Sequence, residues 1–173
     1  LEGGVKVLSE VNMGLAALLL VFVILAGPTL AIVTGFFENL VAYGRYLPEL
    51  SMPFGREDAN FASGWTAFYW AWWISWSPFV GMFIARVSRG RTVREFLIAV
   101  LIVPTVLSVL WMTAMGGTAI GQVIGEGYTA VQDAALELKL FQMLTQLPLT
   151  AITSFVGIVL VVVFFITSSD SGS

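Results

Sequence analysis

The 173-residue chain contains no cysteine and no histidine, and only 11% of its residues are charged. These absences exclude disulfides, thiolate clusters, His-based zinc sites, haem ligation by either residue and general-base catalysis by histidine. Nothing in the composition indicates nucleic-acid binding, since basic residues are few. What is abundant is apolar surface: 58% of the residues are hydrophobic and the mean hydropathy is +0.91. A soluble domain of this size cannot cover so much apolar surface, so we expect an all-α integral membrane protein.

Four apolar stretches are long enough to cross a bilayer as helices. We expect these spans at residues 12–37, 62–86, 93–115 and 149–173. The dipeptide Gly27-Pro28 interrupts the first span and predicts a kink or a local opening, because proline cannot donate a helical hydrogen bond.

Pro78 lies inside the second span and removes the amide that would bond the carbonyl of Ile74. Ser75 and Ser77 are close enough in sequence to satisfy backbone groups freed in this way. We therefore expect the second span to contain a proline-distorted helix.

Positive charge predicts the topology, because four of the eight Lys and Arg residues lie within nine positions: Arg86, Arg89, Arg91 and Arg94. The positive-inside rule places the short loop 87–92 in the cytoplasm. The segment 1–11 is then cytoplasmic too, while loops 38–61 and 116–148 face outward.

Each outer loop is expected to contain a helical segment. Residues 37–48 are typical of a short amphipathic helix lying along the membrane surface. Residues 128–147 show helical spacing of apolar side chains, interrupted by charged and amide side chains that favour an outer-face helix over a span. The glycine-rich stretch 116–127 is expected to leave this helix jointed.

Residues 61–83 contain ten aromatic side chains, five of them Trp. At about 100° per residue, seven of the ten fall within an arc of roughly 80°. They are Phe61, Trp65, Tyr69, Trp72, Trp76, Phe79 and Phe83, with Trp73 just beside the arc. Because ring quadrupoles attract cations without a buried anion, this stripe predicts a path for a desolvated organic cation. The alternative is that the rings pack against neighbouring helices or face lipid.

The fourth span ends in a run of hydroxyl side chains from Thr167 to Ser169, followed by Asp170. One interpretation is a polar cytoplasmic helix end. The other is a sodium site, in which hydroxyls and the carbonyls freed on a distorted helix supply the oxygen ligands.

A long segment of this sequence is similar to the betaine/choline/carnitine transporter family. The resemblance rests on GWTAFYWAWWISWSPFVGMFIARVSRGRTVREF at residues 64–96, LAGPT at residues 25–29 and TSSDSGS at residues 167–173. It covers essentially the whole chain. It implies a leucine-transporter-like fold of twelve helices, with two inverted five-helix repeats, of which this chain holds helices seven to ten. We therefore expect an internal piece of a longer multi-pass protein of the bacterial inner (plasma) membrane.

The resemblance also implies roles for individual residues. Trp73 matches the ring that completes the family's aromatic box, and Trp72, Trp76 and Phe79 match neighbouring pathway aromatics. The carbonyl of Phe164 and the hydroxyls of Thr167 and Ser168 match half of a sodium site. The segment 37–48 matches a surface helix that takes part in homotrimer contacts.

The expected function is import of a quaternary ammonium osmolyte, glycine betaine or choline, by sodium or proton symport with alternating access. No bond is broken, so no enzyme and no cofactor is expected, apart from sodium as a coupling ion. Membrane lipid and the quaternary ammonium substrate are the expected partners. The alternatives are a sodium-independent carnitine-type exchanger and a non-transporting membrane scaffold subunit.

Overall fold

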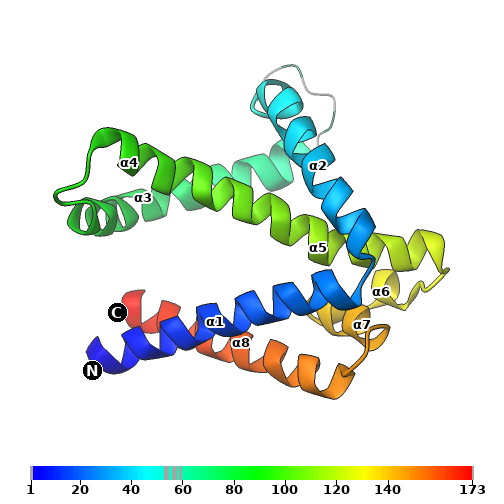
Figure 1. The fold of residues 1–173 in the computed structure, drawn as a ribbon. Coiled ribbons are helices and arrows are strands. Elements are labelled where there is room, and N and C mark those ends of the chain that lie inside the picture. The colour runs from blue at the N-terminus through cyan, green and yellow to red at the C-terminus, as the bar shows by residue number, and fades with distance from the viewer. Residues whose placement is uncertain (1, 53–54, 56–57, 59, 173) are drawn as a thin grey trace. The chain divides into compact units, whose positions relative to one another are not determined.

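The computed structural model describes residues 2–52, 55, 58 and 60–172, and within them the chain is almost entirely helical, without a strand (Figure 1). The all-α prediction is therefore confirmed. The elements are α1 (Glu2–Ala26), α2 (Thr29–Leu50), π-helix η1 (Asn60–Thr66), α3 (Ala67–Val87), α4 (Val93–Leu97), π-helix η2 (Ile98–Ile102), α5 (Val103–Gly125), α6 (Ala130–Asp133), 3₁₀-helix η3 (Leu136–Leu138), α7 (Lys139–Thr145) and α8 (Thr150–Gly172).

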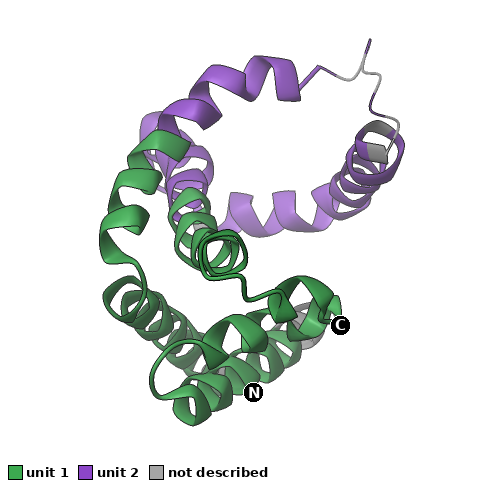
Figure 2. Ribbon diagram, turned by 90° about the vertical axis from the view of Figure 1, so that its right-hand side faces the viewer, with its two compact units in different colours: residues 1–39, 108–173 green, residues 40–107 purple. Residues whose placement is uncertain are grey.

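The chain divides into two compact units (Figure 2). Unit 1 comprises residues 1–39 and 108–173, and unit 2 comprises residues 40–107. The two candidate sites fall in different units, so each is considered by itself.

Three stretches of the described helices are long and apolar enough to cross a membrane: Lys6–Ala26, Val93–Gly125 and Thr150–Thr167. They correspond to three of the four predicted spans. Among the described helices, the Trp-rich α3, which corresponds to the second predicted span, does not meet the same combination of length and hydropathy. Where a bilayer lies along these helices stays a prediction.

The first predicted span, 12–37, is divided between two helices. Helix α1 ends at Ala26 and α2 begins at Thr29, so Gly27-Pro28 ends a helix as well as bending it. The Thr29 hydroxyl donates to the carbonyl of Ile24 at 2.7 Å, which replaces the hydrogen bond that Pro28 cannot donate. The apolar helix therefore begins earlier and ends earlier than predicted. The expected surface segment 37–48 forms the second half of α2.

The core of unit 1 lies where α1, α5, α6 and α7 meet. It is built from Leu19, Val23, Met115, Val131, Met143, Leu144 and Leu147. Helix α8 packs against both α1 and α7, and it runs antiparallel to α1 (Figure 1). Gly157 of α8 permits the contact with α7, since a Cβ there would lie 3.2 Å from the Phe141 ring.

The third predicted span, 93–115, is part of a longer helical run. Elements α4, η2 and α5 follow one another without interruption from Val93 to Gly125, a length of about 50 Å. Helical structure thus continues through part of the expected outer loop 116–148. Met115, Thr118 and Gln122 are buried on one face of α5, and this packing outweighs the low helix propensity of the glycines between them.

Residues 128–147 form three short helices where a single jointed helix was expected. Ala134 is extended, with φ −66° and ψ 149°, and separates α6 from η3. The fold-back brings the Tyr128 hydroxyl to 2.9 Å from Oε1 of Gln142. A straight helix would separate residues 14 apart by about 21 Å, so a tertiary hydrogen bond and core packing decide the conformation here.

Unit 2 contains the second half of α2, η1, α3, α4, η2 and the start of α5. Among its described residues none is buried. The turn between α3 and α4 ends at Thr92, which forms a capping box with Glu95 at the start of α4.

Candidate functional site

The predicted aromatic stripe forms a continuous row of ring contacts along α3. Successive ring centroids are 6.0 Å apart for Trp65 and Tyr69, 6.1 Å for Tyr69 and Trp72, 6.4 Å for Trp72 and Trp76, and 6.0 Å for Trp76 and Phe79. Most of these pairs are edge-to-face, the arrangement that ring quadrupoles favour. The helical phasing predicted this row, and its geometry follows from i, i+3 and i, i+4 neighbours on one face.

Trp73 contacts the row from the side. Its ring centroid lies 6.0 Å from that of Trp72. Its exposed fraction is 61%, against 46% for Trp72 and 43% for Trp76, because the rings within the row shield one another. Trp73 therefore lies beside the row and contacts it through Trp72.

The backbone at Pro78 is satisfied in the way the sequence predicts. The Ser77 hydroxyl donates to the carbonyl of Ile74 at 3.0 Å, which is the carbonyl that Pro78 leaves without an amide. The Ser75 hydroxyl donates to the carbonyl of Trp72 at 2.9 Å. Helix α3 therefore runs through Pro78 without a break and keeps the ring row continuous.

A single row of rings is one wall of a cation site. The rings of Trp72, Trp73, Trp76 and Phe79 are each between 43% and 61% exposed, so α3 alone does not enclose a ligand. A desolvated quaternary ammonium group needs rings on more than one side, since one desolvated cation–π contact contributes only about 2 kcal/mol. The row can supply several such contacts to a ligand that a second element covers.

The predicted sodium half-site lies near the end of α8. The Thr167 hydroxyl is 3.0 Å from the carbonyl oxygen of Phe164 and 3.0 Å from that of Val163. Two of the three predicted oxygen ligands are therefore neighbours. The side chain of Ser168 lies outside the described residues.

Helix α8 differs from the expected distorted helix in one respect. It is continuous α-helix from Thr150 to Gly172, so no unwound segment frees the carbonyl of Phe164. In the observed geometry the Thr167 hydroxyl donates back into its own helix, as threonines in apolar helices commonly do. An ion at this position requires that hydroxyl to direct a lone pair outward.

Unit 1 also contains buried polar atoms without partners, which the sequence reasoning did not single out. Thr118 is 2% exposed and Gln122 is 4% exposed, yet Oγ1 of Thr118 and Oε1 of Gln122 have no hydrogen-bond partner among the described residues. The Gln122 amide nitrogen donates to the carbonyl of Met143 at 3.1 Å, which fixes the orientation of the amide. Two polar residues four positions apart in an apolar helix were the available sequence signal.

Comparison with known proteins bears on the whole chain. The family model of the betaine/carnitine/choline transporters matches residues 1–173. The chain is 68% identical over 173 residues to a glycine betaine/proline/choline transporter of Vibrio parahaemolyticus, covering 100% of this chain and 31% of that protein. It is 56% identical over 177 residues to glycine betaine transporter 1 of the same organism, covering 100% of this chain and 33% of the relative.

A third relative is the glycine betaine transporter OpuD of Bacillus subtilis, 46% identical over 173 residues, with 98% of this chain and 34% of that protein covered. The chain thus spans about a third of the length of these curated relatives. All three relatives are transporters rather than enzymes, and the three apolar helices agree with a membrane protein. The chain belongs to the betaine/carnitine/choline family of transporters.

Proposed function

We propose that this chain is the central part of a secondary active transporter that imports a quaternary ammonium osmolyte, glycine betaine or choline. The complete protein would be a twelve-helix homotrimer of the bacterial inner membrane with a leucine-transporter-like inverted repeat. It would work by alternating access, with sodium or proton symport. Family membership and the relatives' names support the substrate class.

The ring row on α3 is the observation that carries this proposal. Trp72, Trp76 and Phe79 present contiguous rings at spacings of 6.0–6.4 Å, and Trp73 adds a fourth ring at the side. A trimethylammonium group is weakly hydrated, so a few cation–π contacts offset much of its dehydration. They would offset far less for the strongly hydrated ammonium of lysine.

Substitution of single rings in the complete transporter tests the proposal. Trp73→Leu and Trp76→Leu each remove one ring face and should weaken betaine or choline binding by up to about 30-fold, while the Phe variants retain part of the affinity. Uptake into proteoliposomes and direct binding in detergent are the measurements. Trp70→Leu is the matched control, since Trp70 lies on the same helix, is 60% exposed and is outside the row.

An equal loss in all three Leu variants would show that α3 tolerates no substitution and that the row has no special role. Full retention of binding in Trp73→Leu and Trp76→Leu would contradict a cation path along α3. Thermal stabilisation of the wild-type protein by betaine, but not by glycine, separates a transporter from a scaffold subunit.

Sodium coupling is the part of the proposal that has an alternative, which is sodium-independent transport. The proximity of the Phe164 carbonyl and the Thr167 hydroxyl supports a half-site, and the unbroken helix favours the sodium-independent alternative. Thr167→Val should raise the sodium concentration needed for half-maximal uptake, with little effect on the maximal rate at saturating sodium. Undiminished uptake after replacement of sodium by potassium would exclude sodium coupling and leave proton symport or the carnitine-type exchanger.

A further inference from the structure

The helical run from Val93 to Gly125 contains one segment that is not α-helix. Helix α4 continues into α5 (Figure 1), and the π-helix η2 lies between them. The amide of Val103, directly after η2, donates to the carbonyl of Ile98, five residues earlier. An α-helix joins residues four apart, so η2 closes a wider turn. The backbone ladder is therefore irregular where α4 meets α5.

A proline directly after η2 weakens the same place. Pro104 is the second residue of α5 and cannot donate a hydrogen bond to the carbonyl of Val100. Proline is well tolerated in the first turn of a helix, so α5 begins here as a separate helix would begin. The Thr105 hydroxyl donates to the carbonyl of Leu101 at 2.7 Å, which adds a side-chain bond beside the irregular ladder.

A comparison with α3 shows that a proline alone does not produce this geometry. Helix α3 contains Pro78 and stays α-helical through that residue. There the Ser77 hydroxyl donates to the carbonyl of Ile74, which the proline leaves without an amide. The π-turn before Pro104 is therefore a feature of its own, and it coincides with a proline.

Packing along the run also changes beyond this point. The later part of α5 is held by its neighbours, since Thr113 and Gln122 are among its buried residues. Residues 98–107 include no buried side chain, and Leu101 and Ile102 are 60% and 57% exposed. A segment with few buried contacts opens more readily than a packed one. Mobility is therefore expected at η2 and not in the packed part of α5.

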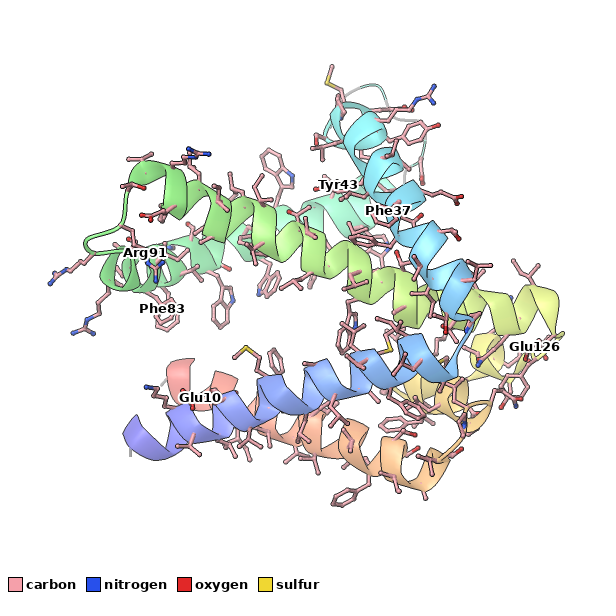
Figure 3. The ribbon with its side chains drawn as sticks, in the orientation of Figure 1. Glu10, Phe37, Tyr43, Phe83, Arg91 and Glu126 are labelled. Atoms are coloured by element: carbon pink, nitrogen blue, oxygen red, sulfur yellow. The ribbon has the colours of Figure 1, made fainter. Side chains whose placement is uncertain are left out.

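The segment before η2 is short and well defined. The capping box of Thr92 and Glu95 fixes the start of α4. A short turn joins α4 to α3, and Figure 3 shows Phe83 near the end of α3 and Arg91 in this turn. A bend at η2 would therefore displace α4 and, through the turn, the helix that carries the ring row.

We propose that η2 and Pro104 form a joint at which α4 bends relative to α5 during alternating access. Bends in helices occur at prolines and at π-turns, and here the two coincide. The joint would let the ring row change position while the packed part of α5 keeps its core contacts. This inference rests on the transport function proposed above, but a joint is a property of the helix and is measurable without transport.

Hydrogen–deuterium exchange of the complete transporter in detergent is the first test. The amides of residues 98–107 should exchange at least about tenfold faster than those of residues 113–122. Addition of betaine should change the exchange of the first segment and leave that of the second unchanged. This comparison is made within the wild-type protein, so it does not depend on whether a variant folds.

Two variants then remove the joint. Pro104→Ala gives the carbonyl of Val100 a helical donor, and deletion of Ala99 shortens the π-turn by one residue. Each should slow the exchange of residues 98–107 to within about threefold of that of residues 113–122. Each should also lower the maximal rate of betaine uptake by about tenfold and change betaine affinity by less than about twofold, because a joint acts on the conformational step.

Ser108→Ala is the matched control. It raises helix propensity one turn after Pro104, at an exposed position in ordinary α-helix, without restoring a backbone donor. Its exchange and its uptake rate should equal those of the wild type. An equal loss of rate in Ser108→Ala and Pro104→Ala would show that the whole helix is sensitive to substitution and would contradict a joint.

Two further results would overturn the joint. One is equal exchange of residues 98–107 and 113–122 in the wild type. The other is wild-type exchange and uptake rate in both Pro104→Ala and the deletion variant. Failure of the wild-type protein to take up betaine would instead contradict the proposed function, and the exchange comparison would still decide whether the joint exists.

Discussion

The two units of this chain handle apolar surface in opposite ways. In unit 1 the residues Leu19, Val23 and Leu144 are at most 1% exposed and pack into one core. In unit 2 none of the described residues is buried, and the Trp rings of α3 remain 43–61% exposed. Unit 1 therefore buries apolar side chains against one another, whereas the aromatic face of α3 requires lipid, further protein or a ligand to cover it.

The difference follows from side-chain type. Aliphatic side chains in unit 1 interdigitate between α1, α5, α7 and α8, and close packing is the only interaction that they require. The aromatic side chains of α3 contact mainly one another along the helix, which leaves their faces available to a cation. A surface suited to binding is therefore the one that its own unit leaves uncovered.

The largest expected effect comes from the core of unit 1. Leu144→Ala should lower the free energy of unfolding of the complete protein by about 2–5 kcal/mol, since it removes a fully buried side chain from packed surroundings. Unfolding in mixed micelles with increasing SDS measures this. The control is Leu101→Ala in unit 2, where the side chain is 60% exposed and the loss should be below about 0.5 kcal/mol.

A loss of several kcal/mol in Leu101→Ala would break the comparison. It would show that protein outside residues 1–173 covers this side of unit 2 in the complete transporter. Equal small losses at both positions would instead contradict the packed core of unit 1.

The next largest effect on stability is expected from alanine substitution of two glycines, one in each unit. A Cβ on Gly27 would lie 2.6 Å from the carbonyl oxygen of Val23, and one on Gly44 would meet nothing within 4 Å. Gly27→Ala should therefore destabilise the protein by about 1–3 kcal/mol, because the α1–α2 junction must shift. Gly44→Ala should stabilise it by about 0.5–1 kcal/mol through helix propensity.

Opposite signs in the two variants, measured by the same SDS titration, would sharpen the contrast between the units. Destabilisation by Gly44→Ala would mean that another helix packs closely there in the complete protein. Tolerance of Gly27→Ala would contradict the tight junction.

Local chemistry was predictable from the sequence, and tertiary context was not. The Ser77 bond to Ile74 and the helix end at Gly27-Pro28 follow from the missing amide of proline. The ring row of α3 follows from helical periodicity. These features need only residues a few positions apart.

The helix through Gly116-Gly117 and the fold-back of residues 128–147 depend on distant partners. Low propensity predicted a loop at the glycines, but burial of Thr118 and Gln122 holds the helix. The hydrogen bond from Tyr128 to Gln142 has no signal in periodicity. The second wall of the cation site could not be predicted either. Helix α3 supplies one row of rings, and the chain covers about a third of its relatives' length.

The smallest expected effect distinguishes two buried threonines on α5. The Thr113 hydroxyl donates to the carbonyl of Val109 at 2.7 Å and accepts from Nδ2 of Asn39 at 2.9 Å. The Thr118 hydroxyl has no hydrogen-bond partner within the part of the chain that the structure describes. Thr113→Val should cost about 0.5–1.5 kcal/mol, and Thr118→Val should be neutral or stabilising by up to about 1 kcal/mol. The SDS titration again measures both.

A cost at Thr118 equal to that at Thr113 would overturn the reading of Thr118 as an unsatisfied group. Such a result would place a polar partner, a water or a bound ion, beside Thr118 in the complete protein. Unit 1 would then hold a polar site inside its own core, and the division between a self-covered unit and a ligand-binding unit would no longer hold.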